Sequence, residues 1–97
     1  MNKIQINGVE YPCEMTMGAP LRFKRETGKD WSLVSDTSDV VTLLWCCVVS
    51  ACNAHKIEFS MSLLDFADQL PLETLEVFAS SLNETDDKKK QTEQNPA

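Results

Sequence analysis

The sequence predicts a small α+β domain in which an N-terminal β-hairpin packs against about four helices. Three observations lead to this prediction. Apolar and polar residues alternate on both sides of Asn7-Gly8, residues 40–52 are almost continuously apolar, and two later segments repeat apolar residues at helical spacing. A chain of 97 residues is long enough for one domain. We expect this domain to span residues 1–82, followed by a disordered polar tail over residues 83–97, which can bury almost nothing.

Residues 3–15 are predicted to form the hairpin. An Asn-Gly pair favours a type I′ turn, because both central residues of that turn need a positive φ. With Asn7-Gly8 in the turn, the strand pairs are Ile6 with Val9 and Ile4 with Tyr11. One face of the hairpin is then formed by Ile4, Ile6, Val9, Tyr11, Cys13 and Met15. An isolated hairpin is marginally stable in water, so we expect this face to rest on helices.

The next segment, "GAPLRFKRETGKD", is predicted to form the first helix. Pro20 suits the first turn, where its missing N–H removes no hydrogen bond, and Gly28 suits the position just after the last helical residue. Phe23 is the large apolar anchor of this helix. Arg22 and Glu26 are four residues apart, so they can form an ion pair across one turn.

Residues 40–52 are predicted to form a buried central helix, with Ser38 and Asp39 as its N-cap and first turn. The segment is long for a strand and contains neither Gly nor Pro. It also holds three of the four cysteines, which raises the question of a metal site or a disulfide. The central helix is therefore expected to form the middle of the core.

The cysteines of this segment do not share a helix face. At about 100° per residue, Cys46 and Cys47 diverge by that angle, and Cys52 lies about 120° or more from either. A zinc site needs thiolates that converge on one centre, so we expect no metal site. We also expect no disulfide, because the sequence indicates a cytoplasmic protein, as argued below, and the cytoplasm is a reducing compartment. The cysteines are interpreted as small buried hydrophobes.

Two amphipathic segments follow the central helix. The connection "AHKIEF" can be a loop or a short third strand. Ser60 or Ser62 suits the N-cap of the first segment, and Pro71 ends it and can open the second. The apolar sets are Leu63, Leu64, Phe66, Ala67 and Leu70 in the first, and Leu72, Leu75, Phe78, Ala79 and Leu82 in the second. This spacing predicts two helices.

Charge and composition limit the classes of partner. The formal net charge is -6 and the pI is near 4.6, so phosphate backbones and anionic membrane surfaces would both repel the chain. A basic cluster surrounds Phe23, but Glu26 and Asp30 interrupt it; its members are Arg22, Lys24, Arg25 and Lys29. The N-terminus lacks a signal-peptide pattern, and no run approaches the roughly 20 apolar residues of a membrane span. We expect a cytoplasmic protein that binds neither nucleic acid nor membrane.

Candidate catalytic groups are few. His55 is the single histidine, and nucleophilic catalysis needs a nucleophile beside a base. The carboxylate pairs Asp36 with Asp39 and Asp65 with Asp68 stand near helix starts, where the helix dipole accounts for them. The glycines form no phosphate-binding loop. We therefore expect a protein that is not an enzyme and that carries no catalytic residues, cofactor or metal.

The predicted elements follow one another in a distinctive order. A hairpin "KIQINGVEYP" leads to a helix "LRFKRETGKD" that ends in Phe-x-x-Glu-Thr-Gly, and then come an apolar helix, a pair of short helices and a charged tail. This order resembles the tail assembly chaperones of long-tailed bacteriophages and prophages. The resemblance covers about residues 1–82, and its sharpest residues are Asn7, Gly8, Phe23, Glu26, Thr27 and Gly28.

The resemblance implies a function in protein binding. Such a chaperone holds the tape measure protein soluble and recruits tail tube subunits while the tube polymerises around it, and its copies can self-associate when bound. In this interpretation Phe23 and Gly28 are structural, and the partner surface is predicted at Leu33, Val34, Met61 and Leu64. The alternative from another class is a small regulatory or adaptor protein, associated with nucleic acid and encoded by a phage or mobile element.

Overall fold

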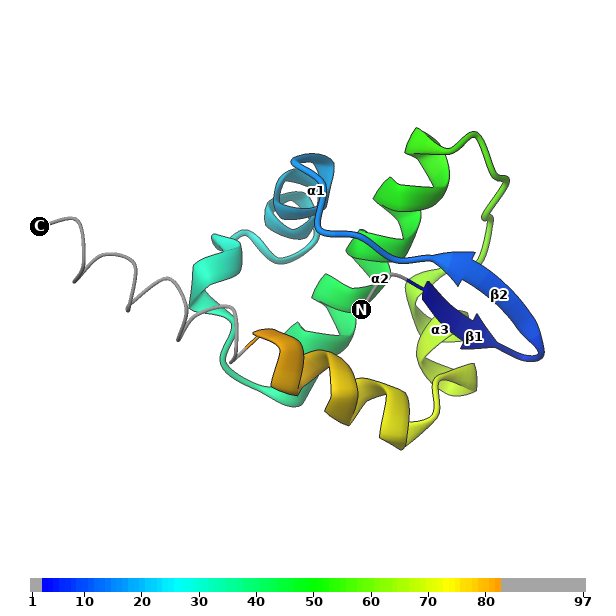
Figure 1. The fold of residues 1–97 in the computed structure, drawn as a ribbon. Coiled ribbons are helices and arrows are strands. Elements are labelled where there is room, and N and C mark those ends of the chain that lie inside the picture. The colour runs from blue at the N-terminus through cyan, green and yellow to red at the C-terminus, as the bar shows by residue number, and fades with distance from the viewer. Residues whose placement is uncertain (1–2, 83–97) are drawn as a thin grey trace, which may run out of the picture.

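The structure, a computed structural model of the chain, describes residues 3–82 (Figure 1). Its elements are β1 (Lys3–Ile6), β2 (Val9–Pro12), α1 (Gly18–Thr27), the 3-10 helix η1 (Trp31–Leu33), α2 (Thr37–Ala54), α3 (Leu63–Gln69) and a last helix over residues 72–82. The predicted α+β class, with an N-terminal antiparallel hairpin followed by helices, is confirmed. The predicted tail over residues 83–97 lies outside the described residues.

Helix α2 is the central element of the fold. Figure 1 shows it running through the middle of the molecule, with α1 on one side, the hairpin and α3 on the other, and the 72–82 helix across its N-terminal half. The buried apolar residues are Ile4, Ile6, Cys13, Ala19, Phe23, Leu43, Leu44, Cys46, Cys47, Val48, Ala51, Cys52, Phe66 and Phe78. Half of them belong to α2, so the apolar segment forms the middle of the core as expected.

By length and composition, α2 is also the one helix among residues 3–82 that could cross a membrane. In this structure 56% of its residues are buried inside the protein. The core helix of a soluble domain passes the same test of length and composition. The sequence pattern of α2 is therefore accounted for by its packing, because the side chains around it come from every other part of the fold.

The hairpin has the predicted turn and register. Asn7 and Gly8 have φ values of 55° and 81°, as a type I′ turn requires, and Ile4 pairs with Tyr11. The predicted apolar face is buried only in part. Ile4 and Ile6 on β1 are buried, whereas Val9, which pairs with Ile6 across the turn, is 50% exposed, so the core covers β1 more completely than β2 (Figure 1).

Helix α1 ends as predicted at Gly28, which has a φ of 81° and donates its N–H to the Lys24 carbonyl at 2.7 Å. The inner side of the helix is held by Phe23, which is fully buried. Arg22 and Glu26 are close enough in sequence to pair across one turn, but they are not among the ion pairs of residues 3–82. The Arg22 Nε instead donates to the Ser50 Oγ on α2 at 2.9 Å, because the packing of α1 on α2 brings this buried hydroxyl within reach.

Gly28→Ala should destabilise the protein by about 1 kcal/mol, because only glycine adopts a positive φ without steric cost. A Cβ at this position would meet no atom within 4 Å, so the loss would report backbone conformation alone. Urea unfolding measures it. Gly28→Asn is the matched control and should lose less, since Asn tolerates the left-handed region. Equal stability of Gly28→Ala and the wild type would contradict this conformation.

Helix α2 starts earlier than predicted. Its N-cap is Asp36, whose Oδ1 accepts the Asp39 N–H at 2.9 Å, and not Ser38. The Asp39 carboxylate instead accepts hydrogen bonds from Lys29 at 2.5 Å and from the Ser35 N–H at 3.2 Å. The Lys29 hydrogen bond lowers the pKa of Asp39 against the opposing effect of partial burial. Asp39 thus ties the end of α1 to the start of α2.

The Lys29–Asp39 pair should make the stability of the fold depend on pH in the acid range. The folded-state pKa of Asp39 lies below the ordinary value of 3.8. The contribution of Asp39 to folding stability is therefore fully present above pH 3.8 and is lost as the pH falls through the lower, folded-state pKa. Asp39→Asn should therefore melt at a lower temperature than the wild type at neutral pH, and the difference should shrink below pH 3.8. A difference that stayed constant across the titration would exclude this role.

Residues 55–62 form a loop and not a third strand. Its Met61 carbonyl accepts a hydrogen bond from the Trp45 Nε1 on α2 at 3.1 Å. Its Phe59 ring lies edge-on to Tyr11 at 5.1 Å and to Phe66 at 6.3 Å between centroids. Ser62 caps α3 by accepting the Asp65 N–H, which agrees with one of the two predicted caps. This loop therefore joins the hairpin, α2 and α3.

Candidate protein-binding surfaces

Several large apolar side chains stay exposed although the core is closed. Within residues 3–82 they are Val9, Met15, Met17, Leu21, Leu33, Ile57, Leu64, Leu72 and Val77. Single exposed apolar residues are ordinary, but groups of them beside charges are typical of protein-binding surfaces. Two such groups are present, one on α1 and one on α3 with the 72–82 helix.

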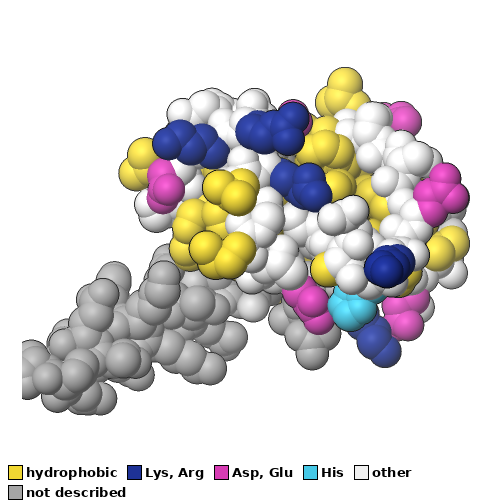
Figure 2. Space-filling view, turned by 90° about the horizontal axis from the view of Figure 1, so that it is seen from above, with side chains coloured by type: hydrophobic (Ala, Val, Ile, Leu, Met, Phe, Trp, Pro, Cys, Tyr) yellow, Lys and Arg dark blue, Asp and Glu magenta, His cyan; other side chains and the backbone are white. Residues whose placement is uncertain are grey.

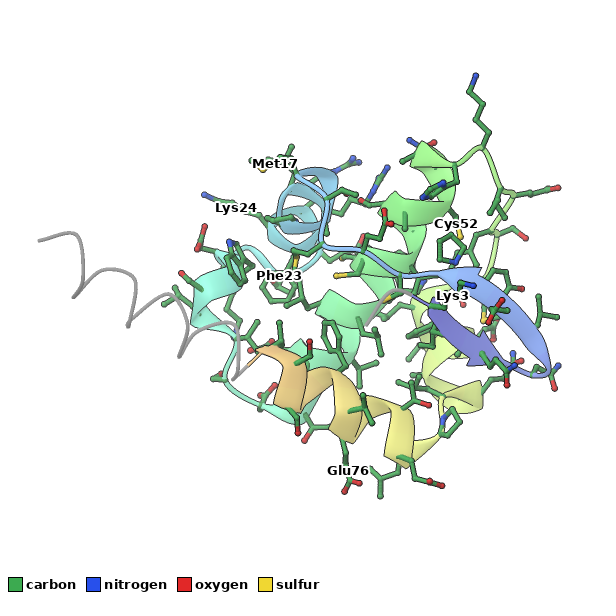
Figure 3. All side chains as sticks on the ribbon, viewed as in Figure 1. Lys3, Met17, Phe23, Lys24, Cys52 and Glu76 are labelled. Atoms are coloured by element: carbon green, nitrogen blue, oxygen red, sulfur yellow. The ribbon has the colours of Figure 1, made fainter. Side chains whose placement is uncertain are left out.

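The first group is the α1 basic face, formed by Met17, Leu21, Arg22, Lys24 and Arg25. Met17 is 82% exposed, and Leu21 lines an open depression together with the three cations. Figure 2 shows Lys and Arg side chains gathered with apolar ones over this part of the molecule. Figure 3 shows Phe23 on the inner side of α1, and Met17 and Lys24 away from it. Helix α1 therefore packs an apolar side against the core and presents a mixed apolar and basic side to solvent.

The second group lies on α3 and the 72–82 helix. Leu64, Leu72 and Val77 are more than half exposed, and the neighbouring charges along both helices are negative: Asp65, Asp68, Glu73 and Glu76. The labelled Glu76 points away from the body of the molecule in Figure 3. The chain thus carries apolar side chains among cations on α1 and among carboxylates on its last two helices.

The predicted partner residues form two separate pairs. Leu33 and Leu64 are exposed, whereas Val34 and Met61 are half-buried and pack against the core. The pair at positions 33 and 34 lies at the end of η1, and the other pair lies at the start of α3. Figure 1 shows these two elements at opposite sides of the molecule. One partner helix cannot contact all four side chains along a single stripe.

The sequence prediction missed Leu21, which is 67% exposed. Its spacing of four from Met17, on the side of the helix opposite Phe23, could have indicated it. This spacing places both side chains on the outer side of α1.

The residues that carry the family resemblance have mostly structural positions. Asn7 and Gly8 form the turn, Phe23 fills the core, and the Thr27 Oγ1 donates to the Phe23 carbonyl at 2.8 Å. Gly28 ends α1, as described above. Glu26 is the exception, because it is exposed and lies beside Trp45 and Val49 at the edge of α2.

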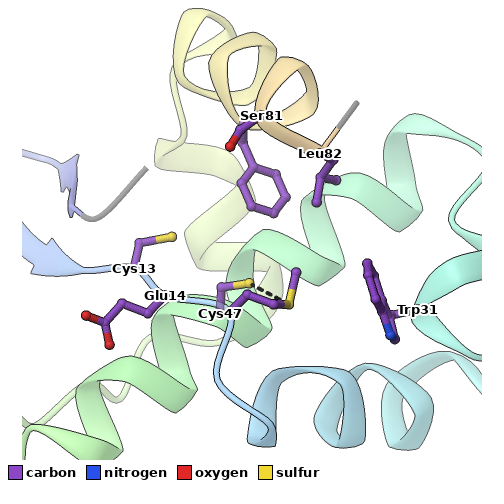
Figure 4. A pocket seen from close by; sticks show the side chains of 8 residues that line it. Cys13, Glu14, Trp31, Cys47, Ser81 and Leu82 are labelled. Atoms are coloured by element: carbon purple, nitrogen blue, oxygen red, sulfur yellow. Dashed lines mark hydrogen bonds between the residues drawn. The ribbon is translucent and has the colours of Figure 1, made fainter. Parts of the chain in front are cut away.

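A small cavity of about 150 Å³ lies between the end of the hairpin, η1, α2 and the 72–82 helix (Figure 4). Its lining side chains are Cys13, Glu14, Met15, Trp31, Cys47, Phe78, Ser81 and Leu82. The Cys47 Sγ donates to the Met15 Sδ at 3.8 Å, and the Glu14 carboxylate contacts the His55 Nε2 at 3.4 Å. The lining thus offers apolar and sulfur contacts. Among residues 3–82 no group of three His, Cys, Asp or Glu side chains could hold a metal ion.

All four thiols are free and buried. Burial raises the pKa of Cys13 to about 11 and that of Cys46 to about 12, and it also raises the pKa values of Cys47 and Cys52. The thiolate is the reactive form of cysteine, so at neutral pH these groups are protonated and poorly nucleophilic. Their positions serve packing.

The cysteines should be unreactive in the folded protein. With a chromogenic disulfide reagent at pH 8, we expect almost no labelling of the native state and labelling of all four thiols after unfolding in urea. Burial leads to the same expectation for the native state, because the reagent cannot reach the buried sulfur atoms. Rapid labelling of even one thiol under native conditions would show that the core opens locally and exposes a sulfur atom.

The chain matches no family model, no curated protein and no solved structure.

Proposed function

We propose that this chain is a non-enzymatic phage tail assembly chaperone that binds the tape measure protein, keeps it soluble and helps to recruit tail tube subunits. Its place of action is the cytoplasm of a bacterium that carries the phage or prophage. The observation that supports this most directly is the contrast between a closed core and exposed apolar side chains set among charges on the outer helices. Such surfaces fit an apolar-striped, helical partner that would otherwise aggregate.

The size and charge of the domain also support this proposal. A chain of 97 residues with a net charge of -6 can coat a long partner in many copies, which would associate with one another while bound. Each copy would cover part of an apolar stripe and add negative charge, and net charge keeps protein assemblies soluble.

The experiment is co-expression with the very long gene expected next to this one. We expect the tape measure protein to be soluble with this chain, insoluble without it, and to co-purify with it. As the control, Val48→Asp should fail to rescue solubility, because an unfolded chaperone presents no surface. A tape measure protein that is equally soluble with and without this chain would contradict the proposed function.

A small regulatory or adaptor protein associated with nucleic acid is the second candidate. The α1 basic face favours it, since Arg22, Lys24 and Arg25 lie together on the surface. The net charge of -6 opposes it, because an acidic protein is repelled by phosphates outside that face. A mobility-shift experiment with duplex DNA and with RNA at low salt separates the two candidates: a shift that disappears in Lys24→Glu/Arg25→Glu would favour the regulator.

A further inference from the structure

The apolar part of the α1 basic face has no role in the core. Met17 and Leu21 are 82% and 67% exposed, and they are neighbours because residues four apart lie on the same side of a helix. Ala19 and Phe23, on the inner side, are fully buried and provide the packing of α1 on the rest of the fold. The outer pair is therefore free to contact another molecule.

The cations of this face are not neutralised by ion pairs within the described chain. Among residues 3–82, Arg22, Lys24 and Arg25 take part in none of the ion pairs, which are Lys3–Glu10, Lys29–Asp39 and His55–Glu14. Arg22 uses one nitrogen to bind the uncharged Ser50 hydroxyl. Helix α1 contains a single carboxylate, Glu26. The face is thus locally positive on a chain whose net charge is -6.

We infer that the α1 basic face docks an acidic amphipathic helix of the partner protein. The apolar stripe of that helix would cover Met17 and Leu21, and carboxylates beside the stripe would pair with Lys24 and Arg25. Methionine adapts to irregular apolar surfaces, which suits a partner whose segments differ in sequence. The inference rests on the proposed function, because it describes the chemistry of the tape measure segment that this chaperone holds.

A single straight helix fits this face better than the other candidates. Helix α1 has ten residues and is about 15 Å long, so it offers one short stripe for a crossing helix. The acidic surface of a second copy is divided between Leu64 on α3 and Leu72 and Val77 on the next helix, so it does not form one stripe. A nucleic acid would supply negative charge but no aliphatic stripe to cover Met17 and Leu21.

The first arm of the test uses two labelled synthetic peptides that form amphipathic helices with the same leucine stripe. One carries Glu and the other Lys at every flanking position. By fluorescence anisotropy, the Glu peptide should bind the wild-type chain at least about tenfold more tightly than the Lys peptide. The preference should weaken between about 0.1 M and 1 M salt, where the screening length falls from about 10 Å to 3 Å. Equal binding of the two peptides, or none, would overturn the inference.

Variants then locate the binding. Lys24→Glu/Arg25→Glu should reverse the peptide preference, whereas Lys3→Glu/Lys56→Glu, which changes the net charge equally, should keep it. Leu21→Ser should weaken binding of the Glu peptide about fivefold. Val9→Ser is its control, because Val9 is 50% exposed and belongs to neither of the two candidate surfaces. Losses that are as large in the controls would place the binding elsewhere. Thermal melting of each variant shows that the fold is retained.

The second arm uses the co-expressed tape measure protein and separates the two proposals. Capture by the wild type and by the control variants, but not by Lys24→Glu/Arg25→Glu, supports both. Capture by all of them contradicts the role of α1 and leaves the proposed function standing. If the wild type captures no tape measure protein, the proposed function is wrong. The peptide experiment then tests by itself whether the α1 basic face binds an acidic amphipathic helix. Light scattering that shows the free chain self-associating through this face would identify a second copy as the occupant and overturn the inference.

Discussion

Val48→Asp is expected to abolish the folded state. Val48 is fully buried at the centre of α2, and an unpaired carboxylate there costs several kcal/mol. The whole stability of a domain of this size is of the order of 5–10 kcal/mol, so little or none of it would remain. Far-UV circular dichroism should show a large loss of helix at 25 °C, and thermal melting should lose its cooperative transition.

The adjacent position provides the control for this prediction. Val49 is half-buried on the same helix and lies in a surface depression with Arg22 and Arg25. A carboxylate at this position would be in contact with water and would have two cations and one carboxylate, Glu26, around the same depression, so Val49→Asp should keep much more of the wild-type stability than Val48→Asp does. Equal melting of Val48→Asp and Val49→Asp would show that α2 does not pack through the face described here.

Phe66→Ala is expected to cost about 3–5 kcal/mol of the free energy of unfolding, because it leaves a cavity in a closed core. Phe66 is fully buried and is the single buried residue of α3, so the substitution removes the contact that holds this helix. It also removes the edge-on contact with Phe59 at 6.3 Å. Urea unfolding followed by circular dichroism measures the loss.

Phe66→Leu is the matched variant. Leucine keeps most of the volume and all of the apolar character of the side chain, so Phe66→Leu should reduce the free energy of unfolding clearly less than Phe66→Ala does. If both substitutions cost the same small amount, α3 would be docked through other side chains, such as the half-buried Leu63 or Leu70. A loss confined to Phe66→Ala supports the packing described here.

The sequence predicted those elements that local rules decide. The turn at Asn7-Gly8 and the end of α1 at Gly28 both depend on a positive φ, which few residue types adopt. The cap at Ser62 depends on one side chain and one N–H three residues later. Such features need little knowledge of the rest of the fold, so the residues themselves predicted both glycine positions and narrowed the cap of α3 to Ser60 or Ser62.

Elements that depend on distant partners could not be predicted in this way. Ser38 and Asp39 were predicted as the N-cap and first turn of α2, but the N-cap is Asp36. Asp39 lies in the first turn, where its carboxylate binds Lys29, ten residues earlier. Arg22 could have paired with Glu26 one turn away, but it binds Ser50, 28 residues later. Alternation correctly identified the inner face of the hairpin, but it could not show that the core covers β1 more completely than β2.

The candidate surface was the least predictable feature. Apolar residues are required for the core and for binding, and the sequence pattern is the same until the packing is known. Val34 and Met61, which were predicted at the partner surface, are half-buried and pack partly against the core, whereas Leu21 was not predicted there and is exposed. Only the position of α1 against α2 shows which of its side chains are left for a partner.

The short connection between α1 and α2 also has a consequence for the order in which the chain folds. Residues 28–36 join the two helices, and Lys29 and Asp39 close a loop of only about ten residues, which takes about 10–100 ns in an unfolded chain. The hairpin, α1 and α2 all lie within the first 54 residues, so they can assemble before the last two helices have left the ribosome. Phe66 and Phe78 come later in the chain. During synthesis the core therefore stays open on one side until the last two helices close it.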